Sequence, residues 1–152
     1  MTKFQQDFLR CLRSSLFTGD PYTLSEAIVK EAKHQSVFSL IAIGTDTYSE
    51  VSRNVQIAYE QRLLGEILKP IPYVVLKGQA AAIYYLQPLR RALGDIDIIV
   101  RPEDFSAAYD TLKSNGYIST LPPEIEYIID VPFTKNGILV ELHKSYAMLN
   151  NK

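Results

Sequence analysis

The sequence has little that could cross-link it, anchor it in a membrane or attract a polyanion. Cys11 is the one cysteine among 152 residues, so a disulfide framework is excluded and a reducing compartment is indicated. There is no run of 18 apolar residues and no charged-then-apolar leader, which predicts a soluble, cytoplasmic protein with no membrane partner. The 16 basic and 17 acidic residues nearly cancel, so we expect no duplex DNA as a partner.

Helical periodicity dominates the first part of the chain. Four helices are predicted: one ending near Gly19, one opened by a Thr23-x-x-Glu26 capping box, one within residues 32–44, and one from about Ser49 to Leu68. We expect an apolar stripe on the fourth helix made of Val55, Tyr59, Leu63 and Ile67, with Ala58, Leu64 and Leu68 flanking it. The Lys69-Pro70-Ile71-Pro72 run ends this helix, because proline tolerates neither a helix interior nor a helical predecessor.

Strand signals follow in the second half. Apolar strands are predicted at 73–76 and 95–100, and a hairpin at 126–134 and 138–143, turned at Asn136-Gly137. Between them, a helix that starts at Pro102 and closes at Gly116 should bury Phe105, Ala108, Tyr109 and Leu112. The predicted fold class is therefore α+β: a helical N-terminal subdomain (1–70), a core with a small mixed β-sheet and flanking helices (71–146), and a tail (147–152).

The segment DIDIIV carries the first candidate site. Side chains alternate faces along a strand, so Asp95 and Asp97 point the same way while Ile96 and Ile98 point into the core. The two carboxylates lie about 6.6 Å apart along the backbone, close enough to converge on divalent metals about 3.5–4 Å apart. Hard oxygen ligands suit Mg²⁺. The alternative is a half-exposed strand with two acids facing water.

Positive charge and a glycine precede these acids. Lys77 and Arg91 can neutralise phosphate groups, and Gly78 lets backbone N–H groups at a helix start approach an anion. Lys77 could instead be only the charged end of a strand. Arg90 competes with Arg91 for the phosphate role on the residues alone.

The order of these motifs resembles the polymerase-β-type nucleotidyltransferase superfamily. More narrowly, a strand ending in Lys-Gly, an Arg four residues before Asp-x-Asp, and Val-Arg-Pro-Glu-Asp after it resemble a largely uncharacterised nucleotidyltransferase family. The resemblance covers roughly residues 32–143. It selects Arg91 over Arg90, includes Gly94 in the Arg-x-x-Gly-Asp-x-Asp run, and makes Glu141 the third metal carboxylate. Without the resemblance, Glu141 would be interpreted as a solvated residue on one face of a hairpin.

The resemblance implies transfer of a nucleoside monophosphate from an NTP to a hydroxyl. Asp95, Asp97 and Glu141 would be the catalytic and metal residues, with Mg²⁺ or Mn²⁺ as cofactor. Lys77, Gly78, Arg91, Gly94 and His143 would bind the nucleotide. His143 lies two strand positions after Glu141 and so on the same face, where it contacts a phosphate or a metal ligand, or is only a cross-strand neighbour.

Two other functions stay open at this point: a non-catalytic nucleotide-binding module or truncated subunit, and an Asp-x-Asp glycosyltransferase. The acceptor is a small molecule, a protein hydroxyl or a tRNA end. Family members usually continue beyond the third carboxylate strand, so we expect the nucleotide half of a site without a full acceptor half. The N-terminal helices (roughly residues 3–68), a second copy of the chain as a homo-oligomer, or another subunit would then cover the acceptor side.

Overall fold

The computed structural model describes residues 1–42, 47–122 and 129–145. The chain groups into two units, one of residues 1–56 and 81–93 and the other of residues 57–80 and 94–152. This grouping changes within a helix at residue 57, so a boundary at residue 70 stays a prediction, and the tail 147–152 lies outside the described residues. Among the helices described, none is long and apolar enough to cross a membrane.

The first unit is helical. Its elements are α1 (Lys3–Arg13), continued by a π-helical turn (Ser14–Thr18), α2 (Glu26–His34), α3 (Phe38–Ile41), the start of α4 (Tyr48–Ile67) and a 3₁₀ turn (Pro88–Arg90). The first helix ends at Gly19, as expected, with φ of 71°. A small apolar core joins α1, α2 and α3, formed by Phe8, Cys11, Ile28, Ala32 and Ile41.

The start of α2 differs from the predicted capping box. Ser25, not Thr23, is the N-cap, and its side chain accepts a hydrogen bond from the N–H of Ile28 at 3.3 Å. Glu26 is consequently the first helical residue instead of the third. Leu24 packs partly buried against the core of the unit, which keeps the chain extended through the position where the helix was expected to start.

The single helix predicted within residues 32–44 is wrong. The helix α2 ends at His34, Ser36 adopts a left-handed conformation with φ of 55°, and α3 is only one turn long. The N–H of Val37 donates to the carbonyl of Ala32 at 2.9 Å, which closes the end of α2. The predicted stop at Gly44 lies outside the described residues.

The helix α4 has the predicted extent, but it buries a different face. Val55 and Tyr59 are 48% and 61% exposed, so the predicted stripe is wrong at its first two positions. The buried residues are Asn54, Ile57, Glu60, Leu64 and, just past the helix, Leu68. Asn54 and Glu60 fall on the same three- and four-residue spacing as the apolar ones, and a search for apolar positions overlooks them.

The second unit contains a four-stranded mixed sheet, as predicted, with the order β1-β2-β4-β3. The strands are β1 (Tyr73–Val75), β2 (Asp95–Val100), β3 (Asp130–Lys135) and β4 (Ile138–His143). The outer pairs are antiparallel and the central pair, β2 with β4, is parallel. Asn136 and Gly137 form the predicted hairpin turn, with φ of 52° and 75°. Residues 126–128 of the predicted hairpin lie outside the described residues.

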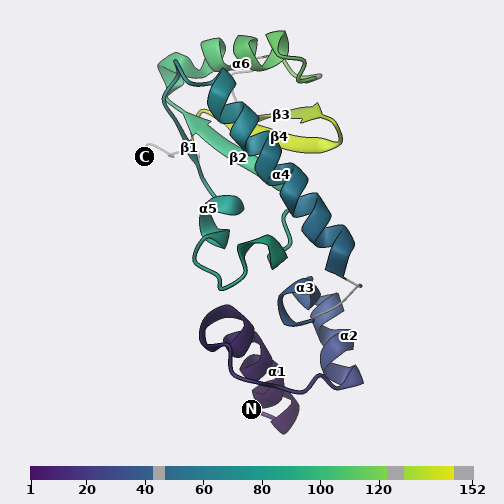
Figure 1. Cartoon of the computed structure of the whole chain (residues 1–152). Coiled ribbons are helices and arrows are strands. Elements are labelled where there is room, and N and C mark those ends of the chain that lie inside the picture. The colour runs from purple at the N-terminus through teal and green to yellow at the C-terminus, as the bar shows by residue number, and fades with distance from the viewer. Residues whose placement is uncertain (43–46, 123–128, 146–152) are drawn as a thin grey trace. The chain divides into compact units, whose positions relative to one another are not determined.

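The sheet has one apolar face and one face that carries the acids. The predicted alternation is confirmed in β4, where Ile138, Val140 and Leu142 are buried and the residues between them are half-buried. In β2, Ile96 and Ile98 lie on the same apolar face. Figure 1 shows α6 (Phe105–Ser114) beside the sheet, in the same unit.

The buried face of α6 agrees with the sequence prediction. The helix buries Phe105, Ala108, Tyr109 and Leu112, the four residues expected. The ring of Tyr109 meets the ring of Phe133 on β3 edge-on, with centroids 5.2 Å apart. Gly116, with φ of 82°, ends the helical segment as predicted.

A buried acid from α4 pairs with a buried phenol. The hydroxyl of Tyr117 donates a hydrogen bond to Glu60 Oε1, and both side chains are buried. Burial, with the Glu60 carboxylate close by, raises the pKa of Tyr117 far above its usual range, so the phenol stays protonated as the donor.

We expect Tyr117→Phe to destabilise the protein, because it leaves the Glu60 carboxylate buried without its donor. The cost should be about 1–3 kcal/mol, or about 2–4 °C in Tm for each kcal/mol. Thermal unfolding followed by circular dichroism measures it. The control is Tyr59→Phe, which removes a hydroxyl from an exposed residue of α4, the helix that carries Glu60, and should leave Tm unchanged. Equal Tm values for all three proteins would contradict this assignment.

Candidate functional site

Asp97 is the centre of the candidate site. Its side chain is 1% exposed, and in the parallel pair β2–β4 it lies opposite Glu141. The N–H of Leu76, just after β1, donates to the Asp97 carbonyl at 3.0 Å, which ties the end of β1 to this position. Asp95, two residues earlier, is half-buried on the same face.

Lys77 contacts both aspartates. Its Nζ lies 3.1 Å from Asp97 Oδ1 and 3.9 Å from Asp95 Oδ2. The hydrogen bond to Asp97 raises the pKa of Lys77, and the nearby acids add to this, so the ammonium is charged at neutral pH. Gly78 follows with φ of 65°, a conformation that glycine adopts without strain, and it leads the chain into α5 (Gln79–Ala82).

His143 belongs to the same cluster. Its Nε2 lies 3.2 Å from Asp97 Oδ1 and 3.6 Å from Glu141 Oε2. With a proton on Nε2 the imidazole donates to Asp97, and Oδ1 of that carboxylate then accepts from both Lys77 and His143. His143 is therefore more than a cross-strand neighbour.

The environment of Glu141 favours its protonated form. Burial is the largest cause that raises the pKa of Glu141, followed by the carboxylate of Asp97, which lies opposite it in the sheet, and the negative charges of Asp95 and Asp130. Asp130 was not predicted as part of the site. It could have been found by counting back from the Asn-Gly turn, because the antiparallel register pairs Asp130 with His143.

The residues present fit a divalent cation. Within the part of the chain that the structure describes, Asp97 Oδ2 is buried and has no hydrogen-bond partner, which is costly unless something positive binds it. Ligand atoms of Asp97, Glu141 and His143 all lie within 4.8 Å of one another. Two carboxylates with a third at Asp95 form a hard-oxygen set of the kind that Mg²⁺ or Mn²⁺ prefers.

Two predicted site residues are not drawn into this cluster by a described contact. Arg91 belongs to the first unit, so its part in the site stays a prediction. Gly94 is exposed in the second unit, and a Cβ added there would meet no described atom within 4 Å. The role of Gly94 also stays a prediction, since no crowding requires a glycine there.

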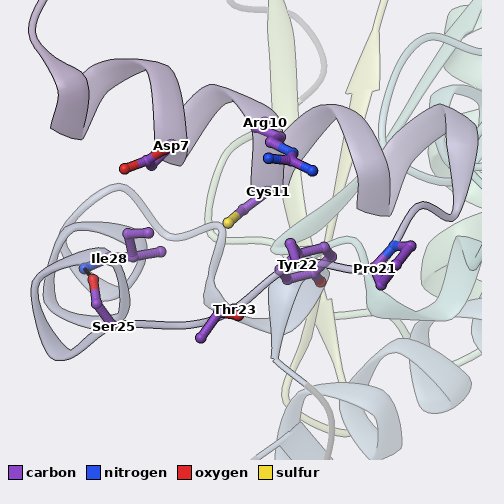
Figure 2. Close-up of a pocket in the computed structure, with 8 residues that line it drawn as sticks. All are labelled: Asp7, Arg10, Cys11, Pro21, Tyr22, Thr23, Ser25 and Ile28. Atoms are coloured by element: carbon purple, nitrogen blue, oxygen red, sulfur yellow. Dashed lines mark hydrogen bonds between the residues drawn. The ribbon is translucent and has the colours of Figure 1, made fainter.

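The first unit has a pocket of its own that sequence reasoning did not identify. Its volume is about 340 Å³, and Figure 2 shows Cys11 between Asp7 and Arg10 on its wall. Burial, with a smaller effect of Asp7, raises the pKa of the Cys11 thiol. The thiol is therefore protonated at neutral pH and unsuited to act as a nucleophile.

Together, the mixed sheet and the acids on its open face define a nucleotidyltransferase-type α+β protein. The chain belongs to a family described as uncharacterised nucleotidyltransferase, whose model matches residues 27–152. No curated protein and no solved structure matches the chain significantly. Family membership confirms the resemblance seen in the motifs and supports nucleotidyl transfer as the general activity.

Glu141→Gln should raise the stability of the metal-free protein at pH 8. A carboxyl whose pKa is raised on folding destabilises the folded state when ionised, and this penalty disappears as the pH falls below the pKa values of both states. Glutamine removes the charge at every pH. If the substitution removes about 1 kcal/mol of destabilisation from the folded state, Tm should rise by about 2–4 °C.

Melting curves in EDTA at pH 8 and pH 4 test this. The gain should be present at pH 8 and lost at pH 4, where wild-type Glu141 is also neutral. Glu66→Gln, at an exposed position of α4, is the control and should change Tm at neither pH. A pH-independent change in the Glu141 variant would contradict the electrostatic cause.

Proposed function

We propose that the protein is a metal-dependent nucleotidyltransferase that moves a nucleoside monophosphate from an NTP to a hydroxyl acceptor and releases pyrophosphate. The observation that carries this proposal is that Asp97 Oδ2 is buried and has no hydrogen-bond partner among the described residues, beside a second acid and a lysine. Family membership supports the reaction class. An Asp-x-Asp glycosyltransferase finds no such support, and we do not propose it.

Asp95, Asp97 and Glu141 would hold Mg²⁺ or Mn²⁺. When bound, the cation would supply positive charge to the phosphates and lower the pKa of the acceptor hydroxyl. His143, at 3.2 Å from Asp97, would fix the orientation of that carboxylate and leave Oδ2 for the cation. Its protonated form could also face a phosphate oxygen.

Lys77 and Arg91 would bind the triphosphate. The Lys77 ammonium is 59% exposed although it contacts Asp97, so it can reach a phosphate without being extracted from the core. Gly78 would allow the backbone N–H groups at the start of α5 to approach a phosphate oxygen, and Gly94 would lie beside the nucleotide just before the Asp-x-Asp strand. Lys77 would make this contact in place of its ion pairs with Asp95 and Asp97.

The chemical step would form one bond and break one. The acceptor oxygen bonds to the α-phosphorus, and the bond from that phosphorus to the bridging oxygen of the β-phosphate breaks, so that pyrophosphate leaves. The acceptor proton would pass to Glu141, the carboxylate opposite Asp97 in the sheet. The acceptor would be a small molecule, a protein hydroxyl or a tRNA end, reached alone or across a second copy of the chain.

The transfer itself is tested by incubation with each α-labelled NTP, Mg²⁺ or Mn²⁺, and candidate acceptors that include the protein. Mass analysis should find an acceptor heavier by one nucleoside monophosphate, in a reaction that EDTA abolishes. Tight Mg²⁺-dependent NTP binding with no product for any acceptor class would instead favour the non-catalytic nucleotide-binding module. Light scattering on the same sample reports whether the active species is a homo-oligomer.

The acids are tested by Asp95→Asn combined with Asp97→Asn. The change keeps the shape and removes the charge that holds a dication, so Mg²⁺-dependent NTP binding should be lost in titration calorimetry. Asp104→Asn, outside the acid cluster, is the matched control and should bind as the wild type does. Equal affinity of the double variant and the wild type would show that these acids do not hold the metal.

Lys77 is tested by Lys77→Ala. A charge-assisted hydrogen bond contributes about 1.5–3 kcal/mol, so NTP affinity should fall by about 10–150-fold. The loss of affinity should exceed the loss of stability, because the Lys77 side chain is mostly exposed and His143 still contacts Asp97 Oδ1. Lys69→Ala, at an exposed lysine after α4, controls for net charge. A strongly lowered Tm with unchanged affinity would make Lys77 structural.

A further inference from the structure

His143 and the acids that it contacts all belong to the sheet of the second unit. His143 follows Glu141 by two residues on β4, and the parallel register puts Glu141 opposite Asp97 on β2. Alternate side chains of a strand share a face, so the imidazole and the two carboxylates lie on one side of the sheet. The side chain of His143 is 14% exposed and that of Asp97 is 1% exposed, which leaves little of either to water.

The Nε2 atom of His143 lies between two carboxylates. It is 3.2 Å from Asp97 Oδ1 and 3.6 Å from Glu141 Oε2. The first distance is at the long end of the range for an N–H···O hydrogen bond, and the second is beyond that range. A nitrogen placed to serve one hydrogen bond would lie closer to one acceptor, so the bond to Asp97 alone does not account for this position.

The same distances match those between neighbouring ligands of a metal ion. Bonds from a first-row dication to an imidazole nitrogen or a carboxylate oxygen are about 2.0–2.2 Å long. Two neighbouring ligand atoms are then about 3.0 Å apart in an octahedral shell and about 3.4 Å apart in a tetrahedral one. Ligand atoms of Asp97, Glu141 and His143 all lie within 4.8 Å of one another, so small movements would bring all three onto one ion.

The carboxylate of Asp97 gives an independent reason to place a cation here. Lys77 and His143 both contact Oδ1, whereas Oδ2 is buried and has no hydrogen-bond partner within residues 1–42, 47–122 and 129–145. A buried carboxylate oxygen without a partner is costly. A cation bound by Oδ2 removes that cost.

We propose that His143 is a direct ligand of this cation, through Nε2, and that it makes the site prefer Mn²⁺ to Mg²⁺. Mg²⁺ is bound by oxygen ligands, whereas an imidazole nitrogen adds affinity for transition-metal ions. The carboxylates of Asp95, Asp97 and Glu141 keep the ligand set mainly oxygen, which suits Mn²⁺ among those ions. The inference rests on the proposed function for the presence of a cation, and it identifies which cation the site selects.

A direct ligand and a residue that only orients Asp97 differ in their consequences. If His143 only orients the Asp97 carboxylate, its loss weakens the binding of both ions to the same extent. If Nε2 is a ligand, its loss weakens Mn²⁺ binding much more than Mg²⁺ binding. His143→Gln separates the two roles, because the glutamine amide can donate to Asp97 Oδ1 as the imidazole does, but it offers no imidazole nitrogen.

Titration calorimetry with MnCl₂ and with MgCl₂, on the full chain without a polyhistidine tag and without nucleotide, measures the preference. We expect His143→Gln to weaken Mn²⁺ binding about tenfold or more, and Mg²⁺ binding by less than about twofold. His34→Gln, at the exposed histidine of α2, is the matched control and should bind both ions as the wild type does. The rise in Tm that each ion produces reports the same preference where binding is too weak for calorimetry.

Bound Mn²⁺ also reports its own ligands. Pulsed electron paramagnetic resonance detects the nitrogen nucleus of an imidazole that coordinates the ion, and the chain has two histidines, so mutation assigns the signal. The signal should be present in the wild type and in His34→Gln, and absent in His143→Gln. Its presence in His34→Gln assigns it to His143 even if His143→Gln does not fold.

The outcomes distinguish this inference from the function on which it rests. Equal losses for both ions in His143→Gln, or no nitrogen signal from wild-type protein with bound Mn²⁺, overturn the ligand role and leave the three carboxylates as the metal site of the proposed enzyme. A wild-type protein that binds neither ion, with NTP present or absent, overturns the metal-dependent function and this inference with it. A selective loss of Mn²⁺ affinity together with the nitrogen signal supports His143 as a ligand, and the transfer assay then tests the reaction separately.

Discussion

The buried carboxylate of Asp97 is the constraint on which the site depends. A carboxylate removed from water is tolerated only when positive or donating groups surround it, and here Lys77 and His143 both contact Oδ1. The pairing needs β1 to end beside β2 and β4 to run parallel to β2, so that residues from three separate parts of the chain meet at one point. The order and direction of the strands therefore determine which residues meet at the site.

The negative charges gathered in this cluster reduce the stability of the folded protein. Four acids lie on one face of the sheet, and burial and mutual repulsion raise the pKa of Glu141. A purely structural surface would disperse or neutralise such charges, whereas a site that receives a dication and a polyphosphate gains from collecting them. The raised pKa of Glu141 and the buried Asp97 Oδ2, which has no hydrogen-bond partner within the described part of the chain, support the proposal of metal-dependent chemistry on phosphates, as does membership of a nucleotidyltransferase family.

Buried polar groups on α4 organise irregular backbone and loops in a similar way. Asn54 binds the segment before β2 in the first unit, and Glu60 accepts from Tyr117 in the second. Both residues lie on the spacing of Ile57 and Leu64, where apolar side chains would be the default. Each side chain holds its partner segment in one position through hydrogen bonds, since hydrogen bonds are directional and apolar contacts are not.

The sequence by itself determined the local features. The two-residue period of β2 and β4, the Asn-Gly turn and the buried face of α6 were correct, because each depends on near neighbours in the chain. The family motif also drew attention to Lys77, the aspartates and Glu141. Only the tertiary structure decided that α4 turns Asn54 and Glu60 inward, that Ser25 caps α2, and that His143 and Asp130 join the acids. The physical reason is that burial of a polar residue depends on its partners, and those partners lie tens of residues away.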